Sequence, residues 1–383
     1  MEAIQIQPNS VPVENYSDSF FQNTPLDLRF ESSKYLPFYP VSSINEGSQI
    51  NFFMPKWSSR VVWDLAESLF AVKAKIKTAA GKTPKNNSVV TPINDILYSM
   101  FSDMKTYLNN VCVTPNSMNF GFKKYLENTL SYDGGAKAGI LQAAGYYEDS
   151  AFQFNDIPSN AGALARLERF CNVAQKQDRS ITTKDWNADG IWFVGKLGTD
   201  IDHHIINGID VRLEYTPQSP EFFLLTQEAE KYKFEIDKMV VYGLARTLQA
   251  PIYQKIEQKL KTHDMHLPFK RREVVPYTIP ANNANFISDQ LFAGSTVTPS
   301  RVILAITTEQ AYMGDYQQNP YNFRHSWGDV KIEQVKLTLN GESIDGLILD
   351  DSKEMDYLKL LMYLGMADGY NNNLSMDKYS GGT

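Results

Sequence analysis

The sequence predicts an all-β chain with a few decorating helices, arranged as two tandem β-barrels of which the second is incomplete at its C-terminus. Three observations lead to this prediction. Apolar and charged residues alternate in several short segments, tight-turn dipeptides follow some of these segments, and parts of the first half recur in the second. The length of 383 residues exceeds one ordinary domain and suits two.

Alternation predicts strands that have one buried and one solvent-facing side. In the segment 209–215 every second residue is apolar, and the residues between them are charged. Similar patterns occupy 70–77, 232–237 and 335–339. A period of two places the apolar side chains on one face of a strand. Such strands are typical of antiparallel sheets, because strands of a buried parallel sheet are apolar on both faces.

Two Asn-Gly dipeptides predict tight turns. Asn207-Gly208 lies between Ile206 and Ile209, and Asn340-Gly341 follows Leu339. Asn and Gly tolerate the positive φ angles of a type I′ turn, so we expect a hairpin at each site.

Helices are predicted at four places among the strands. Asp351 and Glu354 have the spacing of a capping box, and Gly365 is the residue type that ends a helix. Pro251 is suited to the first turn of a helix. The predicted helices are 119–131, 162–173, 251–260 and 351–365.

A faint internal repeat indicates a duplicated domain. Leu36-Pro37-Phe38 recurs as Leu267-Pro268-Phe269, 231 positions later. The predicted strand-turn-strand Met104–Val113 recurs as Gln334–Ile344 with a similar spacing, and a predicted helix follows each copy. The segment 301–307 stands where an early strand at 69–77 would have its copy. Several matches in one order at nearly one spacing favour tandem duplication.

The repeat divides the chain into expected domains. After Asp133-Gly134 the first copy continues for roughly a hundred residues of further strands, whereas 14 residues follow Asp368-Gly369 in the second. An open barrel exposes unpaired N–H and C=O groups. We therefore expect either a fragment or a second barrel closed by another polypeptide. The expected divisions are a polar N-terminal arm at 1–34, a first barrel at 35–242, a helical connection at 243–266 and a truncated second barrel at 267–383.

Charge argues against a nucleic-acid-binding chain. The net charge is −7 and the pI is about 5.4, whereas phosphate binding needs clustered Lys and Arg. The compact basic run is Lys270-Arg271-Arg272, which we interpret as a solvated or interface face. The N-terminal arm carries more acidic than basic residues: Glu2, Glu14, Asp18, Asp27 and Glu31 against Arg29 and Lys34.

The two cysteines and the lengths of the apolar runs indicate the cellular compartment that we expect for the chain. Cys112 and Cys171 are too few for a disulfide framework, which favours a reducing compartment. We expect no secretory leader, because the N-terminus lacks a basic segment followed by an apolar one. We also expect no transmembrane segment, because no apolar run reaches about 18 residues.

The histidines do not predict a metal site. His203 and His204 are adjacent, so on a strand their side chains would point to opposite faces. His263 and His266 could share a helical face, but only Asp264 lies near them in sequence. For His325 a buried hydrogen-bonding role is more common than a catalytic one.

No motif of an enzyme family is present. The sequence has no Gly-x-Ser-x-Gly elbow, P-loop or dinucleotide fingerprint. We interpret Asp133-Gly134-Gly135 as a loop and Asp350-Asp351 as a helix cap. Five tryptophans could line a ligand site, although in a β-rich chain they more often fill the core or anchor an interface: Trp57, Trp63, Trp186, Trp192 and Trp327. We therefore expect no catalytic, cofactor-binding or metal-binding residues, and no cofactor.

Four segments resemble a known family: 92–115, 205–213, 267–282 and 318–325, the last reading QNPYNFRH. From about residue 36 to 375 the chain resembles the double jelly-roll major capsid proteins of Polinton/Maverick elements and adintoviruses, a lineage that includes the adenovirus hexon. The resemblance implies two upright jelly rolls per chain. It also implies trimers that form pseudo-hexameric capsomers of an icosahedral shell around double-stranded DNA. Family members continue beyond the region that matches 370–383 with further strands.

The expected function is therefore structural and not enzymatic. The resemblance implies a virion capsid made in the host cytoplasm, with nuclear assembly as one option. Expected partners are further copies of the chain, penton proteins and minor capsid proteins, without direct sequence-specific binding of nucleic acid. Two alternatives remain open: a jelly-roll module that binds a ligand or glycan without assembling, and a jelly-roll metalloenzyme.

Overall fold

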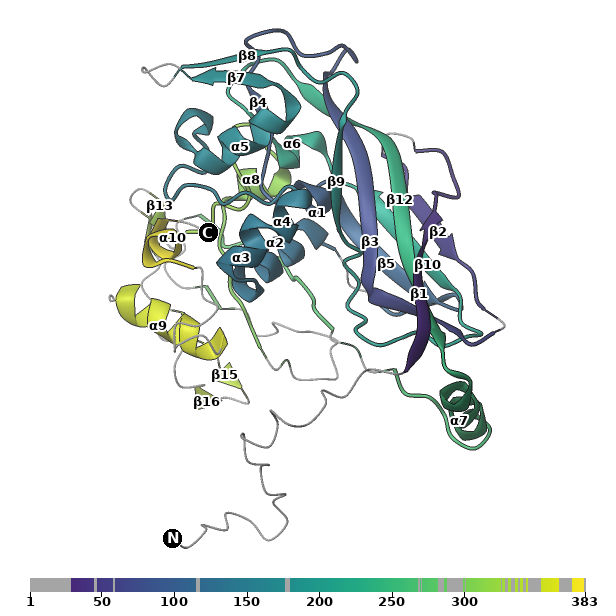
Figure 1. The fold of residues 1–383 in the computed structure, drawn as a ribbon. Helices are drawn as coiled ribbons and strands as arrows, with labels where there is room; N and C mark the ends of the chain where they lie inside the picture. Colours follow the sequence, from purple (N-terminus) through teal and green to yellow (C-terminus); the bar gives the residue numbers. More distant parts are fainter. Residues whose placement is uncertain are drawn as a thin grey trace, which may run out of the picture.

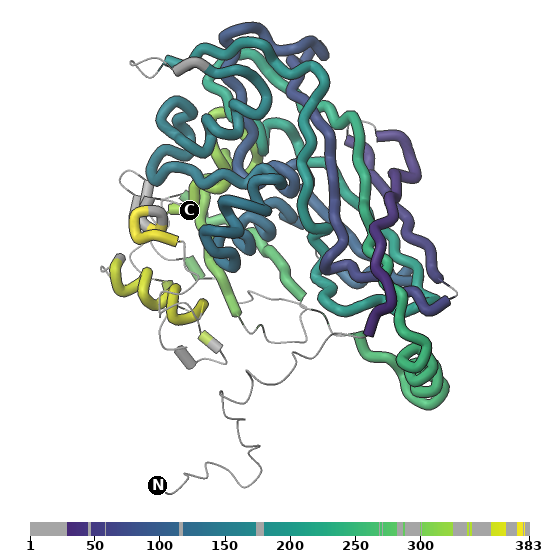
Figure 2. Tube along the Cα trace, viewed as in Figure 1, coloured from purple at the N-terminus to yellow at the C-terminus, as the bar shows by residue number. Residues whose placement is uncertain are grey.

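The structure is a computed structural model of the chain (Figures 1 and 2). It describes residues 29–44, 47–57, 59–114, 118–175, 180–267, 269, 271–281, 286–287, 299, 301–324, 326–327, 330–331, 335–336, 338–339, 342–343, 353–364 and 374–381.

Eight strands form two four-stranded antiparallel sheets (Figure 1). The first sheet has the order β1 (Phe30–Phe38), β12 (Tyr232–Leu248), β3 (Val61–Thr78) and β9 (Ile191–Lys196). The second has the order β2 (Ile50–Met54), β10 (Val211–Pro217), β5 (Phe101–Leu108) and β6 (Val111–Cys112).

The strand order is that of a jelly roll. Numbered one to eight along the chain, these strands lie in the order 1-8-3-6 in one sheet and 2-7-4-5 in the other. Each sheet thus interleaves early with late strands, as two Greek keys do when they form a double-sheet jelly roll. The predicted all-β fold with decorating helices is confirmed.

Aromatic side chains fill the space between the two sheets. Phe70 of β3 stacks on Tyr215 of β10, with ring centroids 4.6 Å apart and an interplanar angle of 6°. Phe52 of β2 meets both rings edge-on. The Tyr215 hydroxyl donates to the Leu197 carbonyl at 3.1 Å, so its burial leaves no polar group unpaired.

Most of the decoration gathers beside β9 (Figure 1). It consists of short helices and two small antiparallel pairs, β11 with β4 and β7 with β8. The helices are α1 (Ile96–Ser99), α2 (Phe120–Ser131), α3 (Gly134–Ala138), α4 (Ile140–Ala143), the 3₁₀ helix η2 (Ile157–Ser159), α5 (Ala161–Phe170) and α6 (Pro220–Phe223). The paired strands are β4 (Val90–Pro92), β11 (Leu224–Thr226), β7 (Asn172–Gln175) and β8 (Ile181–Lys184).

The later part of the chain contributes helices and short strands. The helices are α7 (Ala250–Leu260), α8 (Glu309–Met313), α9 (Lys353–Leu364) and α10 (Met376–Gly381). The strands described beyond residue 267 are β13 (Ser326–Trp327), β14 (Val330–Lys331), β15 (Thr338–Leu339) and β16 (Glu342–Ser343). The four predicted helices are confirmed as α2, α5, α7 and α9, but the end predicted at 173 is wrong, because α5 stops at Phe170 and β7 begins at Asn172.

The turns agree with the sequence in part. Asn109 and Asn110 both have positive φ, at 45° and 68°, and join β5 to β6 as a tight hairpin. The hairpin predicted at Asn207-Gly208 is wrong. Ile205 bridges to Trp63 beside the first sheet, whereas β10 belongs to the second, so this turn passes between sheets. Of the two turn residues, only Gly208 has a positive φ.

Two matches of the repeat do not mark equivalent strands. Leu36, Pro37 and Phe38 lie in β1, whereas Leu267 and Phe269 lie outside regular secondary structure. The segment 301–307 is also not a strand. The jelly roll observed here runs from Phe30 to Leu248, and the division of the chain at 35–242, 243–266 and 267–383 stays a prediction.

Other matches of the repeat coincide with equal local structures. In the first hairpin Tyr107 pairs with Cys112 and Leu108 with Val111. In the second, Thr338 pairs with Ser343 and Leu339 with Glu342, which is the same register 231 positions later. A helix of 12 residues follows each hairpin, α2 and then α9. The turn residues Asn340 and Gly341 lie outside the described residues.

We predict that Phe70→Ala lowers the free energy of unfolding by about 3–5 kcal/mol, because it empties the centre of the aromatic core. Urea denaturation followed by tryptophan fluorescence measures the change. Phe53→Ala is the matched control, because the Phe53 side chain is about half exposed. An equal loss for both variants would contradict a core centred on Phe70.

Candidate functional site

An aromatic cluster holds the segment 307–324, here called the docked segment, against the helices beside the jelly roll. Tyr321 stacks on Tyr125 of α2, with centroids 4.1 Å apart and an angle of 4°. Phe122, on the same helix, contacts Tyr312, Tyr321 and Phe323. The predicted family-like run 318–325 thus supplies rings that bury the outer side of α2.

The backbones approach closely at this contact. A Cβ atom on Gly121 would lie 2.8 Å from the Tyr321 hydroxyl oxygen and 3.1 Å from the Ser99 Cα. Any larger residue at Gly121 would therefore push α2 away from both α1 and Tyr321.

Hydrogen bonds fix the register of the docked segment. The Tyr316 hydroxyl donates to the Tyr232 carbonyl at 2.6 Å, and the Thr226 N–H donates to the Tyr316 carbonyl at 2.8 Å. The Tyr312 hydroxyl donates to Asn119 Oδ1 at 3.1 Å. The segment is thus joined to β12, to β11 and to the start of α2.

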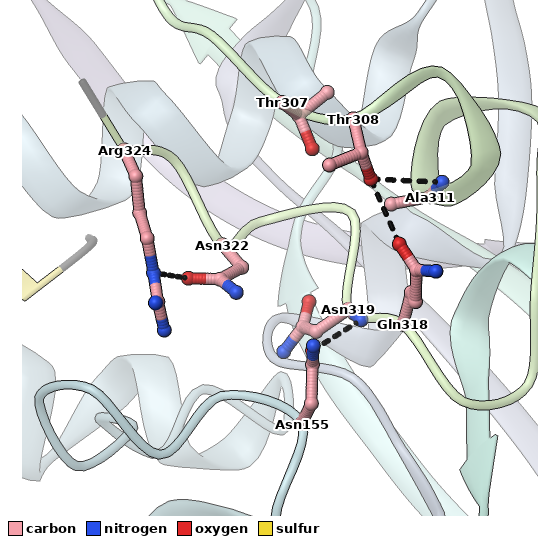
Figure 3. A pocket seen from close by; sticks show the side chains of 8 residues that line it. All are labelled: Asn155, Thr307, Thr308, Ala311, Gln318, Asn319, Asn322 and Arg324. Atoms are coloured by element: carbon pink, nitrogen blue, oxygen red, sulfur yellow. Dashed lines mark hydrogen bonds between the residues drawn. The ribbon is translucent and has the colours of Figure 1, made fainter. Parts of the chain in front are cut away.

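A small polar pocket of about 140 Å³ is lined mainly by this segment (Figure 3). Its wall combines one residue of the loop before η2 with residues of the docked segment: Asn155, Thr307, Thr308, Ala311, Gln318, Asn319, Asn322 and Arg324. None of these was singled out individually from the sequence, because they converge only through the tertiary contact.

An ion cluster ties the predicted basic run to α2. Arg272 donates to Asp200 at 2.9 Å and lies 3.3 Å from Glu127 of α2. Asp200 also pairs with Lys123, and both of these side chains are buried. Arg271 pairs with Glu273 at the surface, and Lys270 lies outside the described residues. Arg272 thus binds acidic side chains of its own chain, and the interpretation of the run as a solvated or interface face stays a prediction.

A buried carboxyl lies where α1 and α2 meet. Asp95, immediately before α1, has no solvent exposure, and Asn128 of α2 donates to its Oδ2 at 2.7 Å. Burial raises the pKa of Asp95 to about 7, and the Asn128 hydrogen bond offsets only part of this rise. No local pattern in the sequence indicates this group, because its burial comes from packing.

The predicted histidine candidates do not converge. His204 Nε2 lies 3.4 Å from Asp64 Oδ2, to which Arg246 donates at 2.7 Å. Burial raises the pKa of Asp64, but hydrogen bonds, led by the one from His204, outweigh burial and lower it to about 2. His203 is exposed and does not join this pair.

The other titratable candidates are likewise separate. His263 and His266 are exposed beyond α7, and His325 lies outside the described residues. Cys171 is buried, which raises its thiol pKa to about 12, and Cys112 lies half-buried in β6. Within the described ranges, no three His, Cys, Asp or Glu side chains are grouped so that they could hold a metal ion.

Two of the five tryptophans are buried in the described part of the chain. Trp63 is fully buried, and its Nε1 donates to the Pro55 carbonyl at 3.1 Å with Trp57 beside it. Trp186 is buried, Trp192 is partly exposed, and Trp327 lies in β13.

Two predicted backbone features have different outcomes. The loop expected at Asp133-Gly134-Gly135 is wrong, because Asp133 accepts the Ala136 N–H at 2.7 Å and caps α3. Asp350 and Asp351 lie outside the described residues.

No helix of the described part is long and apolar enough for a bilayer crossing.

We predict that Asp95→Asn flattens the pH dependence of stability between about pH 4 and 7. Because the folded-state pKa exceeds the ordinary value of about 3.9, the folded chain holds an extra proton in this range and wild-type stability falls as pH rises. At pH 8 we expect the free energy of unfolding of the Asp95→Asn variant to exceed that of the wild type by up to about 4 kcal/mol. Urea denaturation from pH 4 to 8 measures it, and parallel curves for both proteins would contradict it.

We predict that Tyr321→Ala frees the docked segment before the jelly roll unfolds, because it removes the stacked partner of Tyr125. Hydrogen exchange read by mass spectrometry should rise at least tenfold in 308–323, with little change in β10. Met313→Ala is the control, because Met313 is exposed in the same segment. Equal acceleration in β10 would show that the segment is part of one cooperative unit.

Comparison with known proteins gives remote likenesses. No family model matches the chain. An uncharacterised protein of Caenorhabditis elegans is 25% identical over 299 residues, which cover 76% of this chain and 65% of that protein. The chain thus spans just under two thirds of the length of this curated relative.

The chain is similar to solved structures of viral capsids, with TM-scores below 0.5. The Sputnik virophage structure has a TM-score of 0.41 at 12% identity and covers 65% of this chain and 53% of that one. The mavirus major capsid protein has a TM-score of 0.33 at 12% identity and covers 64% and 53%. The PBCV-1 virus capsid has a TM-score of 0.31 at 7% identity and covers 62% and 47%. The jelly-roll assignment rests on the strand order of this chain itself.

Proposed function

We propose that the chain is a major capsid protein, a structural subunit of an icosahedral shell. The observation that carries the proposal is the jelly roll followed, 231 positions after its β5–β6 hairpin, by a second hairpin of the same register and a helix of equal length. A duplicated unit of this kind gives one chain two similar lateral faces. Three chains around an axis then present six faces, which suits hexagonal packing.

The mechanical properties of the jelly roll support a structural role. Each strand is tied laterally by hydrogen bonds, and the space between the sheets is packed with large rings. Such a wall resists deformation, which is what a shell subunit requires.

Exposed apolar residues also support assembly. Tyr35, Tyr39, Val41 and Phe53 are about half exposed or more on the edge strands β1 and β2 and just after β1. Met355, Leu358 and Met362 of α9 are exposed in the same way. Patches of this kind mark interaction surfaces, and obligate interfaces above about 2,000 Å² bury them.

The proposal includes the finer expectations from the sequence. These are homotrimers forming pseudo-hexameric capsomers, a shell around double-stranded DNA, and penton and minor capsid proteins as partners in the virion. The sequence resemblance supports assignment to a Polinton or adintovirus-type element. The proposal gives the chain no catalytic role.

We predict that the purified chain forms trimers or larger particles at micromolar concentration. Light scattering coupled to size-exclusion chromatography measures the mass, and electron microscopy should show particles with three-fold symmetry and six corners. Tyr39→Ser and Leu358→Ser should each weaken the assembly without unfolding the jelly roll. A monomer at all concentrations would contradict the capsid proposal and favour the ligand-binding module.

A further inference from the structure

The pocket lined by the docked segment and Asn155 has a hydrogen-bonded polar wall (Figure 3). Asn319 and Asn322 are buried to more than nine tenths. The carboxamide oxygens of the wall are already used: Asn155 Oδ1 accepts the Asn319 N–H, Gln318 Oε1 accepts the Thr308 hydroxyl, and Asn322 Oδ1 accepts Arg324 Nε, all at 2.8 Å.

These bonds orient the amides. With their oxygens held by the protein, Asn155, Gln318 and Asn322 keep their NH₂ groups available as donors in the wall of the pocket. Those NH₂ groups donate no hydrogen bond within the described part of the chain. The Thr307 hydroxyl adds a further donor, so the pocket offers mainly donors.

Arg324 adds a positive charge to this set of donors. Among the described residues its guanidinium pairs with no carboxylate, and beyond Asn322 it contacts the Phe152 carbonyl at 3.5 Å. The Arg324 side chain is partly buried, and this burial lowers its pKa. A partly desolvated charge that pairs with no carboxylate of the described chain favours an anion.

We propose that this pocket binds a carboxylate group. A single negative charge balances the single guanidinium, and the planar fork of Arg matches the two oxygens of a carboxylate. A dianionic phosphate would leave one charge uncompensated in a partly buried site. The volume of about 140 Å³ suits a group of a few heavy atoms, such as acetate or the end of an acidic side chain.

The carboxylate could be a small free anion or part of a peptide. In either case it would bridge Asn155, in the loop before η2, to the docked segment, and so hold the two together. Binding would stabilise the docked segment by mass action. This inference does not depend on the capsid proposal, because the pocket lies within one chain and is complete without assembly.

The test is thermal unfolding of the full chain in sodium acetate against sodium chloride at equal ionic strength. We expect acetate to raise the Tm above chloride, with sodium phosphate giving less. Arg324→Gln should weaken acetate binding by about tenfold or more. Arg324→Lys keeps the charge without the fork and should bind with intermediate affinity. Arg301→Gln is the matched control, because Arg301 is exposed outside the pocket, and it should behave as wild type.

A second arm separates the two sources of carboxylate. A blocked Gly-Glu-Gly peptide that binds at least tenfold tighter than acetate, with its Gly-Gln-Gly analogue inactive, indicates a peptide ligand. Equal affinity of peptide and acetate indicates a small anion. Should Arg324→Gln fail to fold, titration of the wild-type Arg324 Nε–H resonance with acetate replaces it. Equal effects of acetate and chloride, or an unmoved Arg324 resonance, would overturn the proposal.

Discussion

The pairing of β3 with β12 is the interaction on which the rest of the structure depends. It joins Val61 to Thr247 at one end and Thr78 to Tyr232 at the other, so it brings the beginning and the end of the jelly roll into one sheet. The loop-closure entropy of such distant residues must be offset by a long ladder and a packed face. The strands and helices between β3 and β12 in the sequence lie within the loop that this pairing closes. The helices beside β9 therefore pack against a sheet that is held in place.

Helix α2 connects the jelly roll to the later part of the chain. Its buried side includes Lys123, which pairs with Asp200, and Asn128, which holds Asp95. Its outer side carries Phe122 and Tyr125, which receive the rings of the docked segment. One short helix thus contacts the jelly roll and the segment 307–324 at once, which explains why polar residues with long stems are buried on it.

The sequence predicted what depends on local pattern and missed what depends on packing. Alternation identified β10 correctly, because Val211, Leu213 and Tyr215 all point into the core. The first part of β3 was missed, because the pairing with β12 shifts by several residues between Leu69 and Asp64 and breaks the alternation. The aromatic cluster, Asp95 and the polar pocket had no periodic signal, because each joins residues that only the tertiary fold brings together.

The two hairpin–helix units show which features depend on local sequence and which depend on long-range contacts. Hairpin register is set by the turn and by neighbouring strand residues, so two hairpins of different sequence share it here. Burial is set by what lies across from a helix, and here the two helices differ: α2 is covered by the docked segment, whereas Met355, Leu358 and Met362 of α9 are exposed. The two units thus agree in local pairing, while the contacts around Tyr321 give α2 surroundings that α9 does not have in the described part of the chain.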